Sequence, residues 1–190
     1  MTLDIGNNLL EGIVTEANLS KLSKLRILYL SGNSFSCNIS STWVPPFQLK
    51  ILSISSCKMG PNFPSWLKTQ TSVLYLDISK TVISNTISHW FWDWALHMDF
   101  INLSENQTEN QIDGDLSSIP LYSNAIDIGS NRYRGKLPHL SSHVQVFNMA
   151  KNTFLGPIST FVCQKENKQN TLEVLDVNIT LCQATFLIVG

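Results

Sequence analysis

One spacing constrains the fold of this chain more than any other feature. Apolar residues recur at relative positions 1, 4 and 6, with Asn or Cys at position 9, every 21 to 28 residues. A repeat of this length is typical of an elongated array of stacked coils, in which each coil contacts only its neighbours. The clearest copies are Leu25-Leu28-Leu30-Asn33, Leu49-Leu52-Ile54-Cys57, Met98-Ile101-Leu103-Asn106 and Val144-Phe147-Met149-Asn152.

Positions 4 and 6 are apolar in every copy, so each copy alternates with a period of two. Such alternation predicts a strand with one buried face, and stacked strands form a parallel sheet. This is the leucine-rich repeat. We predict an α/β solenoid of the plant type, a curved right-handed superhelix with a concave parallel β-sheet and short 3₁₀ or helical convex turns. The array covers residues 1–181, with about seven repeats and a partial eighth, and residues 182–190 form a divergent tail.

Position 9 is expected to turn inward after each strand. An amide at this place can bind backbone groups of neighbouring coils, and an unpaired buried polar group would cost about 1–3 kcal/mol. Cys can replace Asn as a small residue with a weak donor. The predicted ladder consists of Asn8, Asn33, Cys57, Thr81, Asn106, Asn131 and Asn152.

The remaining positions of each coil are typical of the plant type of leucine-rich repeat. Position 15 is regularly apolar and position 13 is often Gly, as in an L-x-G-x-I-P element, which predicts a second short strand on the side of each coil. The Trp-rich pieces 42–44, 64–67 and 89–93 are expected to be short 3₁₀ or helical turns that pack their aromatic rings inward.

Composition excludes several classes of partner. The apolar fraction of 43% is enough for a core, and the net charge of −1 gives no reason to expect nucleic acid or an anionic membrane. The first residues already belong to a repeat, so no signal peptide is expected, and no apolar run approaches the roughly 20 residues of a membrane span. The four cysteines show neither CxxC pairing nor zinc spacing.

Several segments resemble the plant leucine-rich-repeat receptor-like proteins of the defence type, and most closely their fungal-xylanase receptor branch. The resemblance covers residues 1–177 and is most specific in the stretches 41–49 (STWVPPFQL) and 55–67 (SSCKMGPNFPSWL). It implies a glycosylated ectodomain at the extracellular side of the plasma membrane, with one membrane helix and a short tail without a kinase. It also implies recognition of microbial proteins or peptides and signalling through a partner receptor kinase.

A ligand site is expected on the concave face, where outward residues flank the buried strand positions. Aromatic side chains would supply contact area, and carboxylates would favour a basic protein or peptide ligand. The alternative is a solvated sheet face with incidental apolar residues. The candidate ligand-binding residues are Tyr29, Ser53, Tyr75, Asp77, Phe100, Asn102, Asp127 and Asn148.

No catalytic motif is present, so we expect neither an enzyme nor a cofactor. His139 and His143 stand four apart, but Pro138 argues against the helix that a shared metal would need, and no metal is expected. Of five Asn-x-Ser/Thr sequons, Asn18, Asn38 and Asn102 are candidates for glycosylation, whereas Asn106 is expected to be buried in the ladder.

Two further interpretations stay open at this stage. The chain could be an inhibitor of cell-wall enzymes of the polygalacturonase-inhibitor type, although such inhibitors have complete capped arrays. It could also be the remnant of a disrupted receptor gene, since the repeat pattern is lost after Val177. Solenoids need polar caps, so an array cut at both ends is expected to be marginally stable and prone to aggregate.

Overall fold

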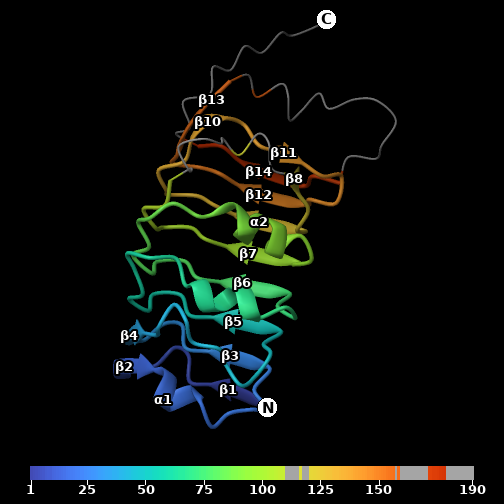
Figure 1. Ribbon diagram of the computed structural model, residues 1–190. Helices are drawn as coiled ribbons and strands as arrows, with labels where there is room; N and C mark the ends of the chain where they lie inside the picture. Colours follow the sequence, from blue (N-terminus) through green and yellow to red (C-terminus); the bar gives the residue numbers. More distant parts are fainter. Residues whose placement is uncertain (110–115, 117–119, 157, 159–170, 179–190) are drawn as a thin grey trace, which may run out of the picture.

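A computed structural model describes residues 1–109, 116, 120–156, 158 and 171–178, and its coils stack along one axis from the N-terminus (Figure 1). Each coil contributes one short strand to an eight-stranded parallel sheet, as the period predicted. The predicted tail, 182–190, lies outside the described residues. The strands in their order across the sheet are β1 (Thr2–Asp4), β3 (Ile27–Tyr29), β5 (Ile51–Ser53), β6 (Tyr75–Asp77), β7 (Phe100–Asn102), β9 (Ala125–Asp127), β12 (Val146–Asn148) and β14 (Val174–Asp176).

The strands pair in strict register, so equivalent repeat positions form straight rows. The central residue of each strand is buried in the coils between the first and the last, for example Leu52 and Phe147, both 0% exposed. Fully burying one such side chain contributes about 1.5–3 kcal/mol. The residues on either side of it face outward and are mostly half-buried. The sheet therefore has one core face and one solvent-facing side, which we call the sheet face.

The second strands are present in only part of the array, so the prediction of one in each coil was wrong. β2 (Glu11–Thr15) pairs with β4 (Ser34–Asn38), and β10 (Arg134–Lys136) pairs with β13 (Thr153–Leu155). A separate short pair, β8 (Pro120–Leu121) with β11 (His139–Leu140), lies beyond position 15 of its coils. After β4 the ladder shrinks to a single bridge from Ser36 to Lys58. In the third coil Pro61 removes a donor, and in the fourth Val82 takes a φ of 55°, which β-branched residues rarely adopt.

The convex turns are helical in three of the described coils. They are α1 (Glu16–Leu19), the 3₁₀ helix η1 (Ser65–Thr69) and α2 (His89–Ala95). The structure corrects the prediction for residues 42–44, which form no helix. Pro45 and Pro46 follow directly, and a residue that precedes proline is driven away from the helical conformation.

The aromatic residues of the convex side pack inward, as predicted. Trp66, Phe91 and Trp92 are at most 4% exposed, and the rings of Phe63 and Phe91 meet edge to face at 5.0 Å. Trp90 and Trp94 are half-buried around them. This stretch is therefore core and not a binding surface.

The asparagine ladder forms as predicted in the interior of the array. Asn106 illustrates it: its Nδ2 donates to the carbonyls of Ile78 in the preceding coil, at 2.9 Å, and of Leu103 and Ser104 in its own coil. Its Oδ1 accepts from the backbone N–H groups of Thr81 and Ile83. Asn33, Asn131 and Asn152 repeat the same arrangement.

The turn that carries the ladder is left-handed. The residue at position 8 has a φ between 53° and 70° in the seven coils from Asn7 to Lys151, although only Gly32 among these residues is a glycine. This conformation is uncommon for residues with a side chain, and the hydrogen bonds of position 9 hold it in place. The members are Asn7, Gly32, Ser56, Lys80, Glu105, Ser130 and Lys151.

Three ladder members differ from the rest. Cys57 donates to Leu30 in the preceding coil at 3.8 Å, and Thr81 binds its own Ile78 carbonyl and the Oδ1 of Asn106. Asn8 is exposed and binds only the carbonyls of its own coil, because no coil precedes it in the structure. The expectation that Asn8 is a buried member is therefore wrong.

We expect Asn106→Asp to lower the free energy of unfolding by at least about 2 kcal/mol, because a carboxylate would face three carbonyls that now receive N–H donors. Urea denaturation of the bacterially produced chain measures this. Asn8→Asp is the matched control at an exposed position and should cost less than about 0.5 kcal/mol. Equal losses for the two variants would contradict the ladder assignment.

The first coil exposes several large apolar side chains. Leu9, which precedes β2, is 99% exposed, and Ile13 within β2 is 64% exposed. An uncovered apolar edge favours self-association.

We expect the purified chain to associate at high concentration, and Leu9→Ser combined with Ile13→Thr to increase the monomer fraction. Light scattering after size-exclusion chromatography measures the mass. The matched control is Leu155→Ser, an exposed apolar residue in β13, far from this edge. An unchanged monomer fraction in the double variant would exclude the first coil as the contact.

Candidate functional site: the sheet face

The sheet face carries two straight rows of side chains along the array. The row at position 3 is mostly apolar, and the row at position 5 is polar. Together the rows contain four aspartates and no lysine or arginine. The first row is Thr2, Ile27, Ile51, Tyr75, Phe100, Ala125, Val146 and Val174; the second is Asp4, Tyr29, Ser53, Asp77, Asn102, Asp127, Asn148 and Asp176.

Tyr75 and Phe100 form the main aromatic feature of this face. They lie opposite each other on β6 and β7, with ring centroids 4.2 Å apart and planes inclined by 7°. Both are half-buried, so part of each ring faces solvent. Burial, together with the charge of Asp77 and the nearby Tyr29, raises the pKa of Tyr75, so its hydroxyl stays neutral at physiological pH.

The polar row has a structural role that the sequence analysis missed. In six of its eight positions an Asp or Asn side chain accepts the backbone N–H two residues later, at 2.8–3.1 Å. This Asx turn ends each strand and leads into the left-handed residue. The sequence carried a signal for it, since Asp or Asn stands at position 5 in those six coils: Asp4, Asp77, Asn102, Asp127, Asn148 and Asp176.

The structure therefore divides the predicted ligand-binding residues. Tyr29, Tyr75 and Phe100 present aromatic surface, whereas Asp77, Asn102, Asp127 and Asn148 form the turns and also line the face. Ser53 is only 7% exposed and binds the Ser31 hydroxyl at 2.7 Å, which leaves little of it for a ligand.

The polar row leaves its carboxylates without basic partners in the row itself. Burial raises the pKa of Asp127 above its ordinary value, with smaller contributions from the charges of Asp176 and Glu105, against hydrogen bonds from Gly129 and Asn148. Lys80 pairs instead with Glu105 at 3.0 Å on the adjoining turns. The face consequently has negative charge that a cationic ligand would neutralise.

The raised pKa predicts the effect of pH on Asp127→Asn. The folded state binds the Asp127 proton more tightly than the unfolded state, so this group loses stability as the pH rises through its folded pKa. We expect the variant to melt at a higher temperature than the parent chain at pH 7 and at the same temperature near pH 3. Asn148 shows that Asn can form the same turn. A lower melting temperature at pH 7 would contradict the assignment.

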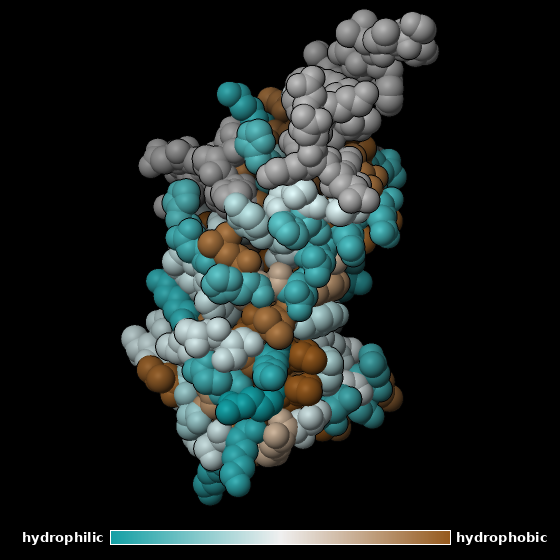
Figure 2. Space-filling model, turned by 90° about the vertical axis from the view of Figure 1, so that its right-hand side faces the viewer, coloured by the Kyte–Doolittle hydropathy of each residue, from teal (hydrophilic) through white to brown (hydrophobic). Residues whose placement is uncertain are grey.

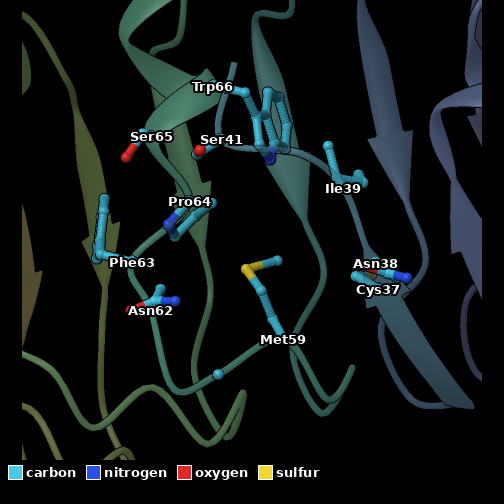
Figure 3. A pocket seen from close by; sticks show the side chains of 11 residues that line it. Cys37, Asn38, Ile39, Ser41, Met59, Asn62, Phe63, Pro64, Ser65 and Trp66 are labelled. Atoms are coloured by element: carbon cyan, nitrogen blue, oxygen red, sulfur yellow. The ribbon is translucent and has the colours of Figure 1, made fainter. Parts of the chain in front are cut away.

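The sequon asparagines lie in different surroundings. Asn18 is exposed, but its Oδ1 accepts from the N–H and hydroxyl of Thr15. Asn102 forms an Asx turn on the sheet face, and Asn106 is buried as predicted. Asn38 is exposed in β4 and lines a lateral pocket between the second and third coils (Figure 3).

Within the described residues, no group of three His, Cys, Asp or Glu side chains is placed to hold a metal ion, and no helix is long and apolar enough to cross a membrane. Cys37 and Cys57 are free thiols. Cys163 and Cys182 lie outside the described residues. Figure 2 shows one side of the molecule with separate hydrophobic patches among hydrophilic side chains.

The repeat geometry and the buried ladder define the class of this protein as a plant-type leucine-rich-repeat array. The Leucine Rich Repeat family matches residues 24–45. The same fold occurs in the plant peptide hormone receptor RGFR1 in complex with RGF2, with a TM-score of 0.75 at 21% identity over 95% of this chain and 28% of that chain.

By sequence the chain belongs with the plant leucine-rich-repeat receptor-like proteins, as the resemblance predicted. It is 40% identical to receptor-like protein EIX2 of Solanum lycopersicum, over 81% of this chain and 15% of the relative. It is also 40% identical to receptor-like protein EIX1 of the same species, over 71% of this chain and 13% of the relative. The chain thus spans about a seventh of the length of these relatives. The leucine-rich-repeat receptor-like proteins are a non-catalytic family, in line with the expectation that this chain is not an enzyme.

Proposed function

We propose that this chain is a recognition module of a plant cell-surface immune receptor, binding a protein or peptide on its concave sheet face. The observation that carries the proposal is the stacked Tyr75–Phe100 pair beside a polar row that contains four aspartates and no lysine or arginine. Aromatic residues of this kind often supply most of the binding energy in an interface, and one-signed charge selects and orients the partner.

The comparisons support the receptor role. The relatives EIX2 and EIX1 are receptor-like proteins, and RGFR1 binds the peptide hormone RGF2 on the same fold. We infer that the full protein is glycosylated, lies at the extracellular side of the plasma membrane and signals in defence with a receptor-like kinase as co-receptor. No nucleic acid and no cofactor enter this function.

The neighbouring coils suggest how to test the charge without disturbing the fold. Asn102 forms the same turn as Asp77, with a distance of 3.0 Å to the N–H of Ser104 against 3.1 Å to that of Ser79. Replacing Asp77 and Asp127 by Asn should therefore remove two charges and keep both turns.

We expect a twelve-residue peptide of alternating Arg and Leu to bind the chain more tightly than the same peptide with Glu in place of Arg. Asp77→Asn combined with Asp127→Asn should weaken binding of the Arg peptide about fivefold per charge, at about 1 kcal/mol each. Phe100→Ala should weaken it about tenfold. Isothermal titration calorimetry at two salt concentrations measures the affinities.

A matched control removes a carboxylate away from the sheet face. Glu11→Gln changes an exposed residue of β2 and should leave the affinity unchanged. Equal binding of the Arg and Glu peptides, or an affinity that Glu11→Gln reduces as much as the double variant does, would overturn the concave site.

A further inference from the structure

A lateral pocket lies beside the second-strand ladder, away from the sheet face. It occupies about 390 Å³ between β4 and the segment that leads into η1. Figure 3 shows Met59 reaching into the middle of the pocket, with Phe63 and Pro64 on one side and Cys37 and Asn38 on the other. A volume of this size is typical of sites that hold a small molecule.

The lining indicates the chemistry of an occupant. Met59, Phe63 and Trp66 supply apolar surface, and polar groups come from side chains such as Ser41 and Ser65. No Asp, Glu, Lys or Arg is among the described residues that line it. A neutral ring with one apolar face and several hydroxyl groups fits this combination, and a sugar has these properties.

Asn38 belongs to both the pocket wall and a sequon, Asn38-Ile39-Ser40. Its side chain is exposed, and within the described part of the chain no hydrogen bond engages its amide. The Oδ1 atoms of Asn18 and Asn102 are occupied by local hydrogen bonds, and Asn106 is 7% exposed. Asn38 is therefore the sequon residue that is exposed, holds no turn through its side chain and lines the pocket.

We propose that Asn38 carries an N-linked glycan whose first N-acetylglucosamine occupies this pocket. Its amide nitrogen forms a bond to C1 of the sugar, the bond from C1 to the pyrophosphate of a lipid-linked oligosaccharide breaks, and the amide gives up one proton. The proposal rests on the proposed function, because this chemistry occurs along the secretory route to the cell surface.

The position gives the sugar a structural role. The second-strand ladder stops after β4, with one bridge from Ser36 to Lys58, so the side of the array opens between the second and third coils. A sugar held there covers Met59 and Phe63, which are both half-buried, and joins the two coils where backbone pairing ends.

Occupancy is tested by producing the chain behind a secretion signal in plant cells and analysing its glycopeptides by mass spectrometry. We expect glycan on Asn38, and loss of that glycan in Ser40→Ala. Ser34→Ala is the matched control, since it changes an exposed serine of β4 outside both the sequon and the pocket lining. An unmodified Asn38 in the secreted chain would overturn the proposal.

Docking is tested by NMR of methyl-labelled methionine, because the chain has only four methionines and Met59 can be assigned through Met59→Leu. We expect the Met59 methyl signal of the glycoprotein to stay unchanged after an endoglycosidase that leaves the first sugar. It should shift after an amidase removes that sugar. A Met59 signal that is the same with and without the sugar would overturn docking.

The two proposals fail in distinguishable ways. The added secretion signal supplies entry to the secretory route, so a glycan in the pocket can be established even if the full protein lies elsewhere. Conversely, loss of peptide binding in the sheet-face variants leaves the Asn38 glycan and the Met59 signal untouched, because the two sites share no residue.

Discussion

The side-chain amide at position 9 is the interaction on which the rest of the array depends. In the interior coils that carry Asn at position 9, this amide binds the carbonyl at position 6 in two successive coils, as Asn131 does with Leu103 and Ile128. These carbonyls lie where the chain leaves the sheet, beyond the hydrogen bonds that join neighbouring strands. An unpaired buried carbonyl would cost about 1–3 kcal/mol, and the ladder removes that cost once per coil.

The ladder also explains why position 8 tolerates a left-handed backbone in residues such as Lys80 and Glu105. The turn brings the next side chain inward, and the hydrogen bonds made there offset the conformational cost. Because this turn recurs in every described coil up to Lys151, each strand leaves the sheet in the same way. The straight rows of the sheet face follow from that regularity.

The parallel sheet, its register and most of the ladder could be predicted from sequence, because they depend on residue types at fixed positions. The missing second strands could not, since they depend on how Pro61 and Val82 shape coils that otherwise keep the repeat. Asn8 was misplaced for a similar reason: the repeat assigns it a ladder position, but burial needs a preceding coil. The repeat predicts the features that all coils share, whereas the burial of a residue depends on whether another coil packs against it.

In the polar row of the sheet face, shape and charge depend on different properties of the side chain. Asp and Asn both form the Asx turn, but only Asp carries a charge. Asp77 and Asn102 make the same hydrogen bond to the backbone, so exchanging one for the other changes the charge of the face while the strand end keeps its shape. Tyr29 and Ser53 show that the row also accepts residues that make no such turn. In the coil of Ser53 the hydroxyl of Ser31 accepts the N–H of Ser55 instead. A scaffold with this property can vary the charge of the sheet face through Asp/Asn exchange alone. The stacked rings of Tyr75 and Phe100 belong to the other row, which such an exchange leaves unchanged.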